Sequence, residues 1–136
     1  ISEDQALDFV LGYTCGNDVS ERIIQRAEMA QRALLIGKGF DTFTPLGPTI
    51  ATGLDPTNID VIARVNGEER QRSNTSDLIF SVAQLVSYIS QSITLMPGDV
   101  IMTGTPSGVS PIVPGDTVEI EISTAGTLSN PVVAES

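Results

Sequence analysis

Three short segments of this 136-residue chain place polar side chains at spacings that could serve chemistry. The first contains Asp18, Arg22 and Gln25, which share one face if a helix starts near Asp18. A carboxylate there could hold a hard cation such as Mg²⁺, while the guanidinium and the amide could orient ligand oxygens. The same spacing also describes a helix cap followed by an ordinary surface ion pair, and spacing alone favours that interpretation.

The second segment places Lys38 between Gly37 and Gly39. Flanking glycines let the backbone approach a ligand closely and aim one amine toward it. The segment is not a phosphate-binding P-loop, because Lys38 is followed by glycine and Arg32 stands where that motif needs its first glycine. A surface loop with a solvated lysine fits the local sequence better than a ligand site does.

The third segment, residues 103–108, reads Thr-Gly-Thr-Pro-Ser-Gly and follows the apolar residues 100–102. Hydroxyls and backbone N–H groups at the end of a strand, shaped by Gly104, could hold a carboxylate or an oxyanion beside Thr105. A tight turn that uses glycine and threonine only for shape explains the segment equally well. Ser107 lacks the spacing of a nucleophile elbow.

The composition excludes several classes of site and partner. Histidine is absent, so the chain contains no Ser-His-Asp or Cys-His arrangement and no histidine-based zinc site. The formal net charge of −10 repels phosphate backbones, so nucleic acid is not an expected partner. Cys15 is the only cysteine and lies among apolar residues, so we expect a small buried side chain and no internal disulfide.

No apolar run reaches the roughly 18 residues that a membrane helix needs, and no secretory leader opens the sequence. We therefore expect no membrane partner and a cytoplasmic, or possible mitochondrial, location. The chain opens at Ile1 and Ser2, without an initiator methionine, and this indicates an upstream portion.

Turn residues and hydrophobic periodicity predict the elements that must position the three segments. Asn66-Gly67 is a strong hairpin signal between two runs of alternating residues. The predicted fold is mainly β with two or three helices, in the α+β class. The expected helices span residues 2–9, 19–33 and 76–90, and the expected strands span 10–15, 59–65, 68–73, 99–103, 117–122 and 127–133.

Taken together and in this order, the segments resemble the fumarylacetoacetate hydrolase family. The resemblance covers nearly the whole chain and rests on several ordered motifs. The matching residues are Gly12-Tyr13-Thr14, Asn17-Asp18-Val19-Ser20, Arg22, Gln25, Gly37-Lys38, Phe40-Asp41-Thr42, Pro45, Gly47-Pro48, Val65-Asn66-Gly67-Glu68, Gln71, Pro97-Gly98-Asp99-Val100-Ile101, Thr103-Gly104-Thr105-Pro106-Ser107-Gly108 and Pro114-Gly115-Asp116.

The resemblance implies a mixed β-roll or barrel-like domain that is incomplete at its N-terminus, with residues 1–136 forming the C-terminal portion of a single catalytic domain. Family members usually form homodimers and bind Mg²⁺, sometimes Mn²⁺ or Ca²⁺. They act on small 2-oxo or 1,3-dioxo acids. The implied activity is C–C bond cleavage of acylpyruvates or fumarylacetoacetate-like acids, and the alternatives are an isomerase, an oxaloacetate decarboxylase or a non-catalytic subunit.

Residue by residue, the resemblance implies that Asp18 is a metal ligand and that Lys38 adds positive charge beside the metal as the catalytic cation. Metal and lysine together would stabilise the enolate that leaves when the C–C bond breaks. Thr42 would support the metal's ligands. The remaining implied roles concern the substrate: Arg22 and Gln25 would contact its carbonyl oxygens, and Thr105 with the backbone of Gly104 would hold its carboxylate.

The chain also departs from the family pattern. Two further carboxylate ligands come from a Glu-x-Glu pair that precedes the Gly-Tyr-Thr segment in the family, and no such pair precedes Asp18 here. Residues 119–121 have that form but lie downstream and fit the solvent side of an alternating strand. The His-Glu pair that activates water is missing as well, and Glu21 replaces an expected small residue. We therefore expect this chain by itself to be inactive or nearly so.

Overall fold

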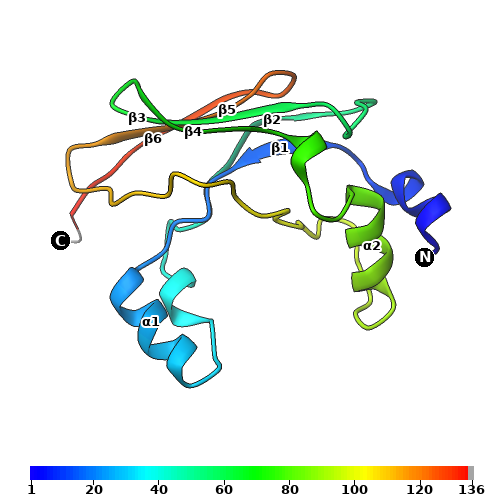
Figure 1. Cartoon of the computed structure of the whole chain (residues 1–136), viewed down its shortest axis with the longest axis horizontal. Coiled ribbons are helices and arrows are strands. Elements are labelled where there is room, and N and C mark those ends of the chain that lie inside the picture. Colours follow the sequence, from blue (N-terminus) through cyan, green and yellow to red (C-terminus); the bar gives the residue numbers. More distant parts are fainter. Residues whose placement is uncertain (135–136) are drawn as a thin grey trace.

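A computed structural model describes residues 1–134 and shows a four-stranded antiparallel sheet as its largest element (Figure 1). The strands are β3 (Asp60–Val65), β4 (Glu68–Asn74), β5 (Thr117–Ile122) and β6 (Gly126–Pro131), in the order β4-β3-β5-β6. The β3–β4 hairpin turns at Asn66-Gly67, where both residues have positive φ, at 53° and 79°. These are the backbone angles that an Asn-Gly turn favours, so a local signal fixes this pairing.

A second, two-stranded sheet, β1 (Tyr13–Gly16) and β2 (Leu46–Ala51), packs against the larger one. The core between them contains Cys15, which is completely buried, and the apolar residues of β3, β5 and β6. The Cys15 thiol donates to the Gly126 carbonyl at 3.2 Å. The predicted role of Cys15 as a small buried side chain is confirmed, and its contacts fix the end of β1 that leads into the candidate site.

Two helical units project from the same side of the sheets (Figure 1). One consists of α1 (Arg22–Ala30) and the 3-10 turn η2 (Ile36–Lys38). The other consists of α2 (Val82–Ser90) and the 3-10 helix η1 (Glu3–Phe9), which pack together. No helix within residues 1–134 is long and apolar enough to cross a membrane.

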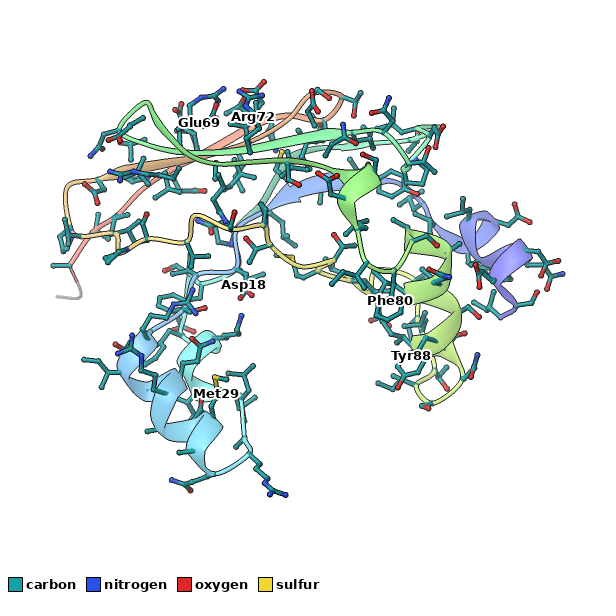
Figure 2. The ribbon with its side chains drawn as sticks, viewed as in Figure 1. Asp18, Met29, Glu69, Arg72, Phe80 and Tyr88 are labelled. Atoms are coloured by element: carbon teal, nitrogen blue, oxygen red, sulfur yellow. The ribbon has the colours of Figure 1, made fainter. Side chains whose placement is uncertain are left out.

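The opposite side of the four-stranded sheet faces solvent. Figure 2 shows Glu69 and Arg72 on this side, away from both helical units. The Arg72 guanidinium donates to both carboxylate oxygens of Glu69, at 2.6 to 3.1 Å. Glu119 and Glu121 alternate along β5 with the buried Val118 and Ile120, as the sequence predicted for a solvent-side pair. This sheet therefore has one side packed against the core and one side exposed to solvent.

The predicted α+β class is confirmed, but several boundaries were wrong. The second predicted long helix begins at Val82, because Ser81 and Gln84 form a capping box there. The 3-10 turn η3 (Thr75–Asp77) occupies the residues before it. The first long helix begins at Arg22, because the Glu21 carboxylate caps it by accepting from the Ile24 N–H at 2.5 Å. The short helix predicted over residues 2–9 is the 3-10 helix Glu3–Phe9, preceded by the extended residue Ser2.

The strand predicted over residues 99–103 is wrong, since these residues form no strand. Asp99 terminates a turn by accepting from the Met96 N–H at 2.8 Å, and no described strand pairs with residues 99–103 in a ladder. Val100 and Met102 are 54% and 41% exposed. The sequence analysis also missed β2, because its Gly-Pro pair is typical of turns; proline is tolerated there because β2 is an edge strand.

Candidate functional site

The candidate site centres on an ion pair between the Lys38 ammonium and the Asp18 carboxylate. Asp18 lies in the connection between β1 and α1, at the junction of the sheets and the helical unit (Figure 2). The Asp18 side chain is 40% exposed and the Lys38 side chain 29%, so both can reach a ligand from solvent. The structure thus brings together two residues that are twenty positions apart in the sequence.

Arg22 and Gln25 form a second pair, on the first turn of α1. The Arg22 Nη1 donates to Gln25 Oε1 at 2.6 Å, and Gln25 is buried with 7% exposure. The hypothesis that Asp18 shares a helical face with them is wrong, because α1 begins at Arg22 and Asp18 lies in the preceding loop. Asp18 reaches the site through the path of that loop instead.

Gly37 sets how closely the lysine-bearing turn approaches α1. A Cβ at this position would lie 2.9 Å from both the Cα and the backbone N of Gln25. The Glu21 N–H donates to the Gly37 carbonyl at 2.8 Å, which closes the same contact from the other side. A side chain at position 37 would push the backbone of this turn away from the backbone of α1. Glycine here therefore allows the turn to hold Lys38 beside the start of α1.

Glu28 fixes the turn from inside the helical unit. Its carboxylate accepts three backbone N–H groups, from Leu35 at 3.2 Å, Ile36 at 2.6 Å and Gly37 at 2.9 Å. These hydrogen bonds, that from Gly37 first, lower the pKa of Glu28 below its ordinary value. The role of Glu28 was not predicted, because no local sequence pattern links it to an irregular segment seven to nine residues downstream.

The Thr103–Gly108 loop crosses the middle of β4, at Arg70 and Gln71. A Cβ on Gly108 would lie 2.1 Å from the Arg70 carbonyl oxygen, and Gly108 has a φ of +98°, so only glycine allows this approach. The Gln71 side-chain amide donates to the Thr105 hydroxyl and to the Pro106 carbonyl, each at 2.9 Å. Gln71 belongs to the residues that match the family, but its contact with this loop could not be predicted from the sequence.

A cavity of about 450 Å³ lies beside this loop. Gly104 and Thr105 line it, as does Thr14, whose hydroxyl is buried without a hydrogen-bond partner within the described chain. The Met102 sulfur lies 3.0 Å from the position of a Cβ on Gly16, so the loop's start passes the end of β1. The Thr105 loop therefore lies beside the strand that leads to Asp18, although no hydrogen bond within residues 1–134 joins Thr105 to Asp18 or Lys38.

Thr42, which the resemblance implied would support the metal's ligands, lies at a second, smaller cavity. It has a positive φ of 68° and lines a smaller cavity of about 180 Å³ with Asn17, Val19 and Phe43. Asn17 is the neighbour of Asp18, so Thr42 lies close to the site, but no hydrogen bond joins Thr42 to the Asp18 side chain in the described part of the chain. Its role in supporting the metal's ligands stays a prediction.

The carboxylates of residues 1–134 do not make a complete metal site. No group of three or more His, Cys, Asp or Glu side chains gathers in this part of the chain. Asp18 offers one carboxylate, whereas Mg²⁺ prefers octahedral oxygen coordination. Glu121, in the Glu-x-Glu stretch of β5, accepts instead from Arg64 at 2.6 Å. Within residues 1–134, the carboxylates alone therefore do not complete the octahedral coordination of a divalent cation.

Comparison with known proteins places these features in a family. The family model for the fumarylacetoacetate (FAA) hydrolase C-terminal domain matches residues 1–133. The chain belongs to the fumarylacetoacetate hydrolase family. Because the match spans nearly the whole chain, the resemblance drawn from the ordered motifs is confirmed.

Solved structures in the family share the fold closely. The 5-carboxymethyl-2-hydroxymuconate delta-isomerase from Mycobacterium smegmatis is 50% identical, with a TM-score of 0.95, over 100% of this chain and 53% of that chain. The fumarylpyruvate hydrolase from Pseudomonas aeruginosa, in complex with Mn²⁺ and pyruvate, is 38% identical, with a TM-score of 0.94, over 99% of this chain and 59% of that chain. The α+β fold observed here is thus a family fold.

Relatives with other chemistry also match. The mitochondrial oxaloacetate tautomerase fahd2 of Xenopus laevis is 45% identical, over 98% of this chain and 44% of that protein. The chain spans about half the length of the first curated relatives it matches, 52% and 54% of two archaeal proteins. Family membership therefore covers hydrolases, isomerases and a tautomerase, all longer than this chain.

Proposed function

We propose that the intact protein is a metal-dependent hydrolase or lyase that cleaves a C–C bond of an acylpyruvate or a fumarylacetoacetate-like 2-oxo acid. The observation that carries the proposal is the Lys38–Asp18 ion pair, on a turn whose Gly37 packs against the backbone of Gln25. The Arg22–Gln25 pair lies on the first turn of α1, so a carboxylate, two cations and an amide come from segments in contact. The Mn²⁺ and pyruvate in the fumarylpyruvate hydrolase structure support a metal and a 2-oxo acid as ligands.

The proposed reaction breaks the bond between the distal acyl carbon and the carbon next to the 2-oxo group. Water adds to the acyl carbonyl, the C–C bond breaks, and its electron pair forms the enolate of the 2-oxo acid. That enolate then takes a proton. The Lys38 ammonium stabilises the negative oxygen as it develops, because a fixed cation acts most strongly where charge appears in the transition state.

The other residues would bind and orient the substrate. Arg22 would meet a carbonyl oxygen while it stays aligned by its 2.6 Å hydrogen bond to Gln25. The Thr105 hydroxyl and the Gly104 backbone N–H would hold the 2-oxo carboxylate. A divalent cation, Mg²⁺ first and Mn²⁺ or Ca²⁺ as alternatives, would act as a Lewis acid when bound. Asp18 would supply one ligand, and the rest of the protein the others.

Two alternatives rest on the same site. An isomerase or an oxaloacetate decarboxylase would also form an enolate beside Lys38, and the isomerase and tautomerase relatives favour such chemistry. A non-catalytic subunit that only binds a small acid would need no ion pair held by a glycine contact. The five polar groups Asp18, Arg22, Gln25, Lys38 and Thr105 therefore favour an enzyme.

Activity of the full-length protein distinguishes these possibilities. With Mg²⁺ or Mn²⁺ present, acylpyruvate, oxaloacetate and a dienoate diacid are each supplied, and products are followed spectroscopically. We expect acylpyruvate cleavage, and we expect Asp18→Ala to abolish it while Asp8→Ala, a change at an exposed carboxylate in η1, leaves it unchanged. Equal turnover by Asp18→Ala and wild type would refute the proposed site.

A further inference from the structure

Gln71 lies on β4 and reaches the Thr103–Gly108 loop with its side-chain amide nitrogen. Nε2 is 2.9 Å from the Thr105 hydroxyl oxygen, 2.9 Å from the Pro106 carbonyl oxygen and 3.4 Å from the Ser107 carbonyl oxygen. Three oxygens of one loop thus surround one nitrogen. The adjacent Gly108 touches β4 at the Arg70 carbonyl, so two successive residues of β4 hold the loop.

The carbonyl groups decide which way the Gln71 amide faces. A backbone carbonyl can only accept a hydrogen bond, so the group that faces Pro106 and Ser107 must be the NH₂ and not the amide oxygen. An amide nitrogen donates and does not accept. The Thr105 hydroxyl must therefore accept from Gln71, which uses one of its lone pairs and leaves its own proton free.

A hydroxyl whose oxygen accepts one hydrogen bond donates its own proton in a stronger hydrogen bond to another group. Within the described chain no acceptor takes the Thr105 proton, and Thr105 is exposed beside the 450 Å³ cavity. A carboxylate oxygen is the natural acceptor there, because hydrogen bonds to charged groups are stronger than those between neutral groups. Polarisation by the amide strengthens such a bond further.

We propose that Gln71 is a positioning residue that fixes the Thr105 hydroxyl as a hydrogen-bond donor to the carboxylate of the bound acid. The inference rests on the proposed function, since it assigns a new residue to the same site. It specifies a ligand with an anionic oxygen at this end of the cavity. A ligand with only donors there, such as an ammonium group in place of the carboxylate, would bind worse.

Pyruvate binding to the full-length, Mn²⁺-loaded protein tests the proposal by calorimetry. Four proteins are compared: wild type, Gln71→Leu, Thr105→Val and the double variant. We expect each single variant to weaken pyruvate about 10- to 100-fold, as for one hydrogen bond to a charged group. The double variant should be no weaker than Thr105→Val alone, because Gln71 acts only through the hydroxyl. Thr105→Ser, which keeps the hydroxyl, should keep most of the affinity.

A second readout separates positioning from mere support of the fold. In turnover assays, Gln71→Leu should raise KM more than it lowers kcat, because the carboxylate contact is made equally before and during bond cleavage. Gln71→Glu keeps the size of the side chain, which guards against a variant that fails to fold. A carboxylic acid donates only when protonated, so we expect pyruvate affinity of this variant to fall with rising pH while the wild type holds steady.

The outcomes for the two proposals differ. If wild type binds pyruvate and Gln71→Leu binds it as tightly, the inference fails while the proposed function stands. The inference fails as well if Gln71→Leu weakens binding by the same factor in the Thr105→Val background. If the wild-type, metal-loaded protein binds no pyruvate and turns over no 2-oxo acid, the proposed function fails and the inference with it.

Discussion

Lys38 and Asp18 keep one another in place at a junction that remains open to solvent. Their side chains are 29% and 40% exposed, so the ion pair contributes little to stability, as is usual for pairs near the surface. Under the proposed function, the ion pair places an ammonium group where an enolate oxygen would form. The effect of removing it should therefore appear in the rate and not in the folding free energy.

Replacing Lys38 by alanine in the full-length protein should lower kcat about 10²- to 10³-fold, the usual cost of removing one group that stabilises a developing oxyanion. KM should change less, because the substrate in its ground state carries no charge at that oxygen. Steady-state kinetics with an acylpyruvate would measure both. Arg26→Ala, which removes an exposed cation from α1, is the matched control and should leave kcat unchanged. Equal losses in both variants would contradict the role of Lys38.

At the scale of elements, α1 and η2 act as one unit. Gly37 allows backbone contact with Gln25, and the Glu28 carboxylate ties down three N–H groups of the turn that carries Lys38. An acceptor for free N–H groups at the start of a helical turn is an N-terminal cap supplied from a distant position. The position of Lys38 therefore depends on the charge state of Glu28.

The lowered pKa of Glu28 determines how the stability that this carboxylate contributes changes with pH. A carboxyl group whose folded-state pKa lies below its unfolded value stabilises the fold above the unfolded pKa and loses that contribution as pH falls through the folded pKa. We expect the Gly37 amide resonance to shift in an NMR titration with a midpoint below that of an ordinary glutamate. Glu28→Gln should abolish the shift. A midpoint at or above the ordinary value would contradict the capping role.

At the scale of the whole molecule, the accessible surface is unusually large. It measures 9270 Å², whereas a folded monomer of 14.4 kDa exposes about 6,800 Å². Large apolar side chains contribute to the excess on both helical units. Figure 2 shows Met29 on the α1–η2 unit and Phe80 and Tyr88 on the α2 side, and they are 61%, 59% and 77% exposed. Residues 1–134 thus leave uncovered an apolar surface of the kind that further protein normally covers.

Metal binding should differ between the 136-residue chain and the full-length protein. We expect the 136-residue chain to bind Mg²⁺ or Mn²⁺ weakly, because Asp18 offers a single carboxylate, and the full-length protein to bind one equivalent tightly. Isothermal calorimetry on both proteins would measure this. Asp18→Ala in the full-length protein should weaken binding, with Asp8→Ala as the control. Tight one-to-one binding by the 136-residue chain would show that its own residues suffice.

The sequence by itself determined what depends on near neighbours. The Asn66-Gly67 hairpin and the burial of Cys15 both follow from local backbone preference or side-chain character. The ordered motifs also determined the family, because several spacings had to agree at once. The α+β class follows from the predicted short strands, the turns between them and the two or three helices.

Only the tertiary structure decided which distant residues meet. Glu28 reaches a turn with no regular spacing, and Gln71 reaches a loop 34 positions away, so no periodicity could reveal either contact. The strand predicted over residues 99–103 failed for the same reason: a strand requires a partner, and local sequence does not say whether one lies alongside. Contacts between residues far apart in sequence arise from how the sheets and helical units pack, and that packing is a property of the whole fold.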